Sequence, residues 1–172
     1  MKNLKKLVSV FLAVVMLLAM STTAFAAVSD TGFSDVAANA WYADSVAYVR
    51  DNGLMGGTST TTFSPNATIT RGQIATILYR ASGSPAVSGG TQFPDVASNA
   101  YYASATRWAS VGGIVSGYSN GSFGPNNPIT RQQLAAILWR YAGSPAASRG
   151  QDFADESSIS SYASTAVDWA RA

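Results

Sequence analysis

The sequence predicts an all-α fold made of tandem helix-loop-helix repeats, and three observations support this prediction. A segment running from Ile69 to Arg80 returns, without gaps, 60 positions later as the segment from Ile129 to Arg140. Within each copy the apolar residues recur with the i, i+3, i+4, i+7 spacing of one buried helix face. Each copy also begins and ends with residues that favour helix termini. Neither helix of a repeat could bury its apolar face alone, so we expect the repeats to pack against one another.

The second helix of each repeat is the best-defined element. It is expected over residues 70–82 and 130–142, with Thr70 and Thr130 as N-caps. A glutamine follows three positions later in both copies, which is the spacing of a capping box. The apolar face that this spacing predicts as buried consists of Ile74, Ile77, Leu78, Leu134, Ile137 and Leu138.

The first helix is expected over residues 42–51 and 102–111, with Gly53 and Gly113 as C-terminal signals. Glycine, serine and proline fill the segments between the two helices of each repeat, which predicts loops. Phe63 and Phe123 lie in these loops, where packing against the helices is a better explanation for them than ligand contact.

The N-terminus is predicted to be a secretory signal peptide over residues 1–26. A basic start is followed by an apolar run from Leu7 to Met20, and Ala24-Phe25-Ala26 forms a small-x-small cleavage site. The apolar run is short for a membrane span, and nothing after it is comparably apolar. We therefore expect a secreted protein without a membrane span after signal removal.

Composition excludes several classes of function. All three lysines lie in the predicted signal, so the remaining chain has eight arginines against nine acidic residues. With a net charge near −1 and no basic stripe, nucleic-acid binding is not expected. The sequence has no cysteine and no histidine. This excludes thiolate and imidazole metal sites and nucleophile pairs that need either residue, so we predict no metal, no cofactor and no catalytic residue.

The arginine at the first helical position, Arg71 and Arg131, runs against a local preference. A cation there faces the positive end of the helix dipole, which costs a few tenths of a kcal/mol. An anionic ligand would explain its recurrence, and so would packing of the long stem against a neighbouring element. The residues alone leave these two interpretations open.

The ordered pattern Phe-x-Asp-Val, Tyr-Ala, Gly, Phe-x-Pro and Ile-Thr-Arg-x-Gln resembles the S-layer homology (SLH) repeat. Two full repeats are expected at residues 31–86 and 91–146, and a partial third repeat at residues 151–172. The resemblance covers essentially the whole chain after the signal. One departure is that the family's acidic residue after Thr-Arg is an amide here, as Gln73 and Gln133. The amide can still cap the helix, but it cannot take over a role that requires a carboxylate at this position.

The resemblance implies a pseudo-threefold bundle with binding grooves between neighbouring repeats. It also implies non-covalent anchoring to secondary cell wall polysaccharide, often pyruvylated, at the cell wall or S-layer of a bacterium with a Gram-positive type envelope. A cargo or effector region is not part of the sequence, which could be a fragment. Because the third repeat is incomplete, we expect repeats one and two to expose an apolar face where its second helix would lie.

Candidate ligand-binding positions combine the resemblance with the chemistry of the residues. A guanidinium can hold a carboxylate through two parallel hydrogen bonds, and the helix N-terminus offers further N–H donors. An aromatic ring can provide a flat face for a sugar, and glycine permits close approach. For the aromatic and aspartate positions, packing and turn formation explain the residues at least as well. The predicted set is Arg71, Arg131, Trp41, Tyr101, Asp35, Asp95, Gly57, Gly117, Gln73 and Gln133.

Three functions remain in competition. The first is a carbohydrate-binding anchor, and the second is a structural surface-layer protein that self-associates. The third is a glycan-acting enzyme. Glycoside hydrolysis usually needs two differentiated carboxylates. The sequence has a single glutamate, Glu156, while Asp35 and Asp95 are equivalent by the repeat. The enzyme is therefore the least favoured of the three.

Overall fold

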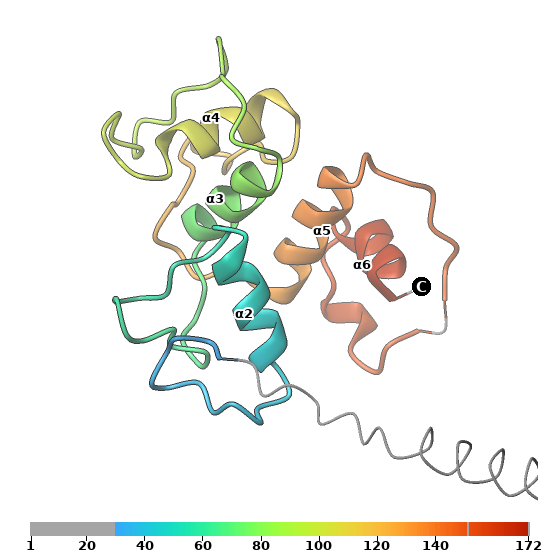
Figure 1. The fold of residues 1–172 in the computed structure, drawn as a ribbon. Helices are drawn as coiled ribbons and strands as arrows, with labels where there is room; N and C mark the ends of the chain where they lie inside the picture. The colour runs from blue at the N-terminus through green and yellow to red at the C-terminus, as the bar shows by residue number, and fades with distance from the viewer. Residues whose placement is uncertain (1–29, 151, 172) are drawn as a thin grey trace, which may run out of the picture.

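A computed structural model describes residues 30–150 and 152–171, and this part of the chain is helical (Figure 1). The predicted signal peptide lies outside the described residues. The α-helices are α2 (Ala43–Asp51), α3 (Arg71–Ala81), α4 (Ala103–Val111), α5 (Arg131–Tyr141) and α6 (Ser164–Arg171), and a short 3-10 helix, η1, covers Glu156–Ser158. The described residues form no strand beyond an isolated bridge between Thr70 and Pro128. The all-α prediction is confirmed.

The second helices begin as the sequence predicts. Thr70 accepts a hydrogen bond from the backbone N–H of Gln73, and the Gln73 side chain accepts one from the N–H of Thr70. Thr130 and Gln133 form the same reciprocal pair at the start of α5. An amide therefore closes the capping box as well as the family's carboxylate would.

The first helices, α2 and α4, begin one residue later than predicted, after Tyr42 and Tyr102. Neither tyrosine makes a side-chain cap, which explains why the sequence contains no sharp start signal for these helices. Both helices end where predicted, at Asp51 and Val111, and the predicted glycines follow two residues later. Gly53 and Gly113 have a φ of 66°, a left-handed conformation that glycine adopts without strain.

One hydrophobic core joins the two full repeats. Helix α3 packs against α4, and α5 packs against α6. All six apolar residues predicted from the second helices lie in this core: Ile74, Leu78 and Ile137 are buried, and Ile77, Leu134 and Leu138 are half-buried against them. The prediction that this helix face lies in the core is therefore confirmed.

Each loop is fastened to the segment before the first helix of its own repeat. The rings of Phe93 and Phe123 lie 5.3 Å apart, and Phe123 is fully buried. The Asp95 carboxylate accepts the backbone N–H groups of Phe123 at 2.8 Å and Gly124 at 2.7 Å. We call this arrangement, in which an aspartate carboxylate holds two loop N–H groups, a clamp. Repeat one has the same clamp, in which Asp35 accepts the N–H groups of Phe63 and Ser64. These aspartates join segments 28 residues apart, a wider role than the local turn expected from sequence.

The clamp leaves an electrostatic signature. The backbone N–H of Phe63 is the main cause of the lowered pKa of Asp35. At Asp95, desolvation raises the pKa, but the N–H groups of Phe123 and Gly124, together with the Arg71 charge, outweigh it and lower the pKa overall. Both clamps therefore need an ionised carboxylate.

The two full repeats meet where the start of α3 docks on the loop of repeat two. The N–H of Arg71 donates to the Asn127 carbonyl at 3.1 Å, and that of Gly72 donates to the Pro125 carbonyl at 2.9 Å. A Cβ on Gly72 would lie 3.0 Å from the Pro125 oxygen, so glycine permits this approach. We call this contact the repeat junction.

The partial repeat, residues 152–171, packs against α5 and leaves an apolar groove of about 830 Å³ beside it. Apolar side chains dominate its walls, among them Leu134, Leu138, Phe153, Ile159 and Val167. The sequence predicted that repeats one and two would expose an apolar face where the second helix of the third repeat would lie, but repeat one contributes none of the lining of this groove. It comes from α5 and the partial repeat itself, because α3 uses its own apolar face against α4.

We predict that Asp95→Ala destabilises the fold by about 1–2 kcal/mol, because it leaves two N–H groups without their charged acceptor; solvent exposure of the carboxylate keeps the value low. Asp155 occupies the same register in the partial repeat, and within the described residues its carboxylate accepts no loop N–H. Asp155→Ala is therefore the matched control, with little expected effect. Urea unfolding measures both, and equal stabilities for the two variants would contradict the clamp.

Acid should weaken the clamps with a defined sign. Because the folded-state pKa values of Asp35 and Asp95 are lowered, their contribution is complete above the unfolded value of about 4 and is lost as the pH falls below it. We expect the free energy of unfolding of the parent to decrease as the pH is lowered past about 4. In Asp95→Ala this decrease should be smaller. Unfolding curves between pH 2 and pH 6, in roughly half-unit steps around the aspartate range, measure it.

We predict that Gly72→Gln destabilises the protein by about 1–3 kcal/mol, because the new side chain must displace the Pro125 backbone or the Tyr102 ring. Glutamine is the residue at the corresponding position 132, where its side chain accepts the backbone N–H of Ser160 at 2.8 Å. Gly56→Gln makes the same change where a Cβ would meet no atom within 4 Å, so it should change stability by less than about 1 kcal/mol. A thermal melt of both variants tests this, and a Gly72→Gln protein as stable as the parent would show that the junction is loose.

Candidate functional site

Two grooves occupy the same register of the two full repeats; their walls mix polar and apolar side chains, and we call them the polar grooves because each includes an arginine. The first groove has a volume of about 510 Å³ and lies between the loop and second helix of repeat one, with Tyr101 of repeat two at its side. The second groove, of about 300 Å³, is formed in the same way by repeat two, with Tyr162 of the partial repeat. Each groove is thus built from one repeat and an aromatic residue of the next.

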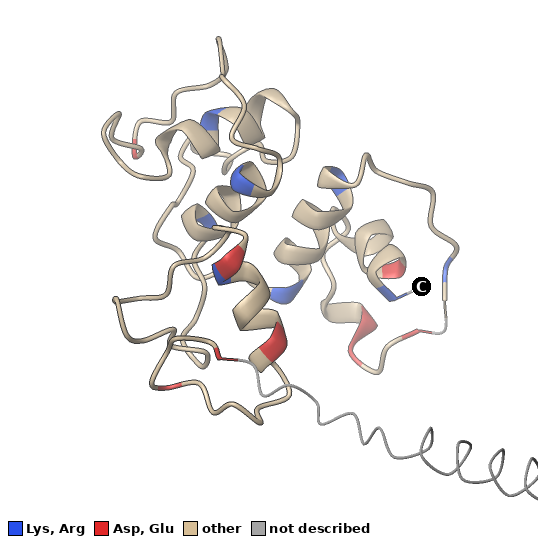
Figure 2. Ribbon diagram, in the orientation of Figure 1, with Lys and Arg blue, Asp and Glu red and all other residues tan. Residues whose placement is uncertain are grey.

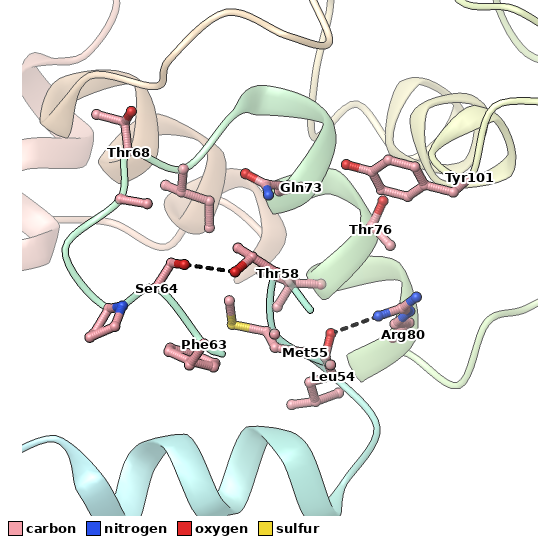
Figure 3. A pocket seen from close by; sticks show the side chains of 16 residues that line it. Leu54, Met55, Thr58, Phe63, Ser64, Thr68, Gln73, Thr76, Arg80 and Tyr101 are labelled. Carbon is pink, nitrogen blue, oxygen red and sulfur yellow. Dashed lines mark hydrogen bonds between the residues drawn. The ribbon is translucent and has the colours of Figure 1, made fainter. Parts of the chain in front are cut away.

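In the first groove, shown in Figure 3, Gln73, Thr76 and Arg80 come from α3, and Tyr101 comes from the turn before α4. Arg80 donates from Nη1 to the Leu54 carbonyl at 3.1 Å, and Thr58 and Ser64 share a 2.6 Å hydrogen bond across the loop. Some of the polar groups that line this groove therefore already have hydrogen-bond partners within the protein.

The second groove differs because an arginine from the preceding repeat enters it. Arg71, at the start of α3, is only 7% exposed. Its Nε donates to the Phe123 carbonyl at 2.9 Å, and its guanidinium lies 4.7 Å from the centre of the Tyr118 ring and 5.0 Å from that of Phe123. These contacts fix the guanidinium before any ligand arrives, which removes the entropy cost of ordering it.

The predicted residues divide between the two grooves. Gly57, Gln73 and Tyr101 line the first groove, and Arg71, Gly117 and Gln133 line the second. The two glycines also serve the loops, because both have a positive φ and a Cβ on either would lie under 3 Å from a phenylalanine ring of its own repeat. The glutamines likewise combine capping with groove lining.

Four predicted residues lie outside both grooves. Asp35 and Asp95 use both carboxylate oxygens on backbone N–H groups, so the structure gives them a fastening role. Trp41 is 92% exposed and packs edge to face on Tyr42. Arg131 is exposed and lines the apolar groove, because within the described residues no loop carbonyl accepts the N–H groups at the start of α5 as happens at the start of α3.

The expected anion site at the N-terminus of α3 is occupied by the protein itself. The N–H groups of Arg71 and Gly72 donate to carbonyls of the repeat-two loop, and the N–H of Gln73 donates to Thr70. The helix end therefore offers no free donors there. Of the two alternatives left open for Arg71, packing is observed, and the groove position remains compatible with ligand contact as well.

Sequence reasoning missed Arg80, Arg140 and Tyr162. Arg140 lines the second groove as Arg80 lines the first. The signal that could have found them was the repeat itself, since an arginine recurs in the last turn of both second helices. It was overlooked because a cation there is well explained by the helix dipole.

Charged residues are sparse on the described part of the chain, as Figure 2 shows. The region contains no group of three metal-ligating side chains and no helix that could cross a membrane. Glu156, the only glutamate, accepts the N–H of Phe153 at 3.2 Å. Glu156 and the neighbouring Asp155 thus lie in the partial repeat, and Glu156 lines neither polar groove.

Three relatives show where chains of this kind occur. An endoglucanase of Bacillus sp. (strain KSM-635) is 38% identical over 78% of this chain, and a surface-layer 125 kDa protein of Lysinibacillus sphaericus is 36% identical over 64%. A cell surface protein of Thermoanaerobacter kivui is 31% identical over 83%. The matched regions are 15%, 10% and 19% of those proteins, so the chain spans less than a fifth of each.

The family model of the S-layer homology domain matches residues 32–75 and 92–135, which carry the first helix, the loop and the start of the second helix in each full repeat. Proteins with surface-layer and cell-surface names among the relatives indicate a cell-surface role for such repeats in bacteria with a Gram-positive type envelope. The chain belongs to the S-layer homology domain family.

Proposed function

We propose that this chain is a non-catalytic anchoring module that binds an acidic secondary cell wall polysaccharide, a pyruvylated glycan, in the second groove. The observation that carries the proposal is the fixed guanidinium of Arg71. Because its Nε already donates to the Phe123 carbonyl, the two terminal nitrogens supply the remaining donors for a ligand. A pyruvate ketal places a carboxylate on the sugar, which is the planar anion that a guanidinium holds best.

The other walls of the groove suit a sugar. Gln133 can donate and accept hydrogen bonds with hydroxyl groups, and Tyr162 is half exposed at the side. Gly117 lines the groove, where the missing side chain leaves the loop backbone accessible to a ligand. A groove that combines an immobile cation, an amide and an aromatic ring favours a carboxylated saccharide over a purely apolar ligand.

We predict that Arg71→Lys weakens binding to isolated pyruvylated wall polysaccharide by about ten- to a hundredfold, the equivalent of losing one charged bidentate hydrogen bond. Lysine keeps the charge but not the fork, and it disturbs the buried site less than alanine would. Isothermal titration with native and chemically depyruvylated polysaccharide measures the effect, and a circular dichroism melt checks the fold.

Arg131→Lys is the matched control, because Arg131 has the same register in the repeat but lies outside both polar grooves. Its affinity should stay within about twofold of the parent. Equal binding of native and depyruvylated polysaccharide by the parent would overturn the pyruvate assignment. If Arg71→Lys and the parent bound native polysaccharide equally well, Arg71 would be a packing residue only.

Self-association at a surface layer is the second candidate function, and the apolar groove between α5 and the partial repeat favours it. Apolar surface of this kind gains free energy when a second chain covers it. Sedimentation velocity over a hundredfold range of protein concentration, without polysaccharide, separates the two functions. A monomer throughout would leave anchoring as the function, whereas Phe153→Ser, which changes an exposed side chain of the same groove, should abolish any association that is seen.

A further inference from the structure

The second groove carries more positive charge than one carboxylate requires. Arg71 from α3 and Arg140 from α5 both line it, and its lining includes no aspartate or glutamate. The first groove has a single arginine, Arg80, and no arginine from a neighbouring repeat. The two grooves therefore differ in charge although their repeats are built alike.

Arg71 has little freedom to leave the groove. Burial, the Nε hydrogen bond and the two aromatic rings hold its guanidinium in place. The positive charge of Arg71 helps to lower the pKa of Asp95. Both carboxylate oxygens of Asp95, however, already accept hydrogen bonds from the N–H groups of Phe123 and Gly124. Asp95 cannot turn towards the groove without breaking the clamp.

Arg140 lies two helical turns beyond Gln133, about 10 Å along the same face of α5. It is half-buried, and the ion pairs found within the described residues, Arg50 with Asp51 and Arg149 with Asp152, do not involve it. Its counterpart Arg80 is tied to the Leu54 carbonyl. Asp95 partly offsets the charge of Arg71, but no acidic residue lines the groove beside Arg140, and an anionic ligand there lowers the remaining repulsion between the two cations.

We propose that the second groove recognises a glycan segment with two acidic groups, one held by Arg71 and the other by Arg140. This inference rests on the proposed function and names its ligand class more narrowly. The groove volume of about 300 Å³ is at the small end for ligand sites. The two acidic groups therefore belong to one sugar or to adjacent sugars.

Two synthetic disaccharides test the proposal. One carries a pyruvate ketal as its only acid, and the other carries the same ketal and a uronic acid carboxylate on the adjoining sugar. We expect the parent chain to bind the two-acid disaccharide about ten- to a hundredfold more tightly in isothermal titration, as one further charged hydrogen bond provides. Arg140→Gln should lose this preference, because it weakens binding of the two-acid disaccharide far more than binding of the one-acid disaccharide.

Two further variants serve as controls, one for net charge and one for folding. Arg149→Gln makes the same change of charge at an exposed site outside the grooves and should keep the preference. Arg140→Lys should keep most of it, and it decides the matter if Arg140→Gln fails to fold in a circular dichroism melt. Loss of the preference in Arg149→Gln would show that net charge, not Arg140, sets it, and would overturn the proposal.

Failure of this inference is distinguishable from failure of the proposed function. If the parent binds both disaccharides equally, or if Arg140→Gln weakens both by the same factor, the two-acid assignment is wrong and single-acid anchoring stands. If the parent binds neither disaccharide nor isolated wall polysaccharide, the proposed function itself is wrong, and this inference falls with it.

Discussion

The docking of α3 on the loop of repeat two is the contact on which the rest of this structure depends. Two backbone N–H groups at the helix start, from Arg71 and Gly72, meet carbonyls of Asn127 and Pro125. This approach closes the core between the repeats and carries the Arg71 side chain into the second groove. A backbone interaction thus positions the side chain to which we assign ligand binding, so stability and binding are coupled at one residue.

Asymmetry between equivalent positions follows from this contact. Arg71 and Arg131 have the same place in the repeat, but one is buried against a docked loop and the other is exposed beside an apolar groove. Gly72 and Gln132 also differ, because a Cβ on Gly72 would lie 3.0 Å from the Pro125 oxygen, whereas the Gln132 side chain accepts the backbone N–H of Ser160 at 2.8 Å. A repeat protein can therefore carry the same motif twice and use it differently, since each copy depends on the neighbour it meets.

Burial of a cation usually costs free energy unless hydrogen bonds and nearby charge compensate for it. Here the Phe123 carbonyl, two aromatic rings and the Asp95 charge provide that compensation at Arg71. The same Asp95 fastens the loop that supplies the carbonyl. Clamp, loop and arginine form one connected unit, which explains how a chain without disulfide bonds can present a preorganised binding group.

The local elements follow from the amino-acid sequence alone. The capping boxes at Thr70 and Thr130, the C-terminal glycines and the buried face through Ile74 and Leu78 depend on neighbours within a few residues, so spacing alone reveals them. Tertiary structure decided the role of each candidate side chain. Asp95 fastens a loop 28 residues away, Arg71 reaches a carbonyl 52 residues away, and Arg140 joins it across the groove. Such contacts depend on which repeat docks on which, and a repeated motif looks identical in every copy until its neighbour is in place.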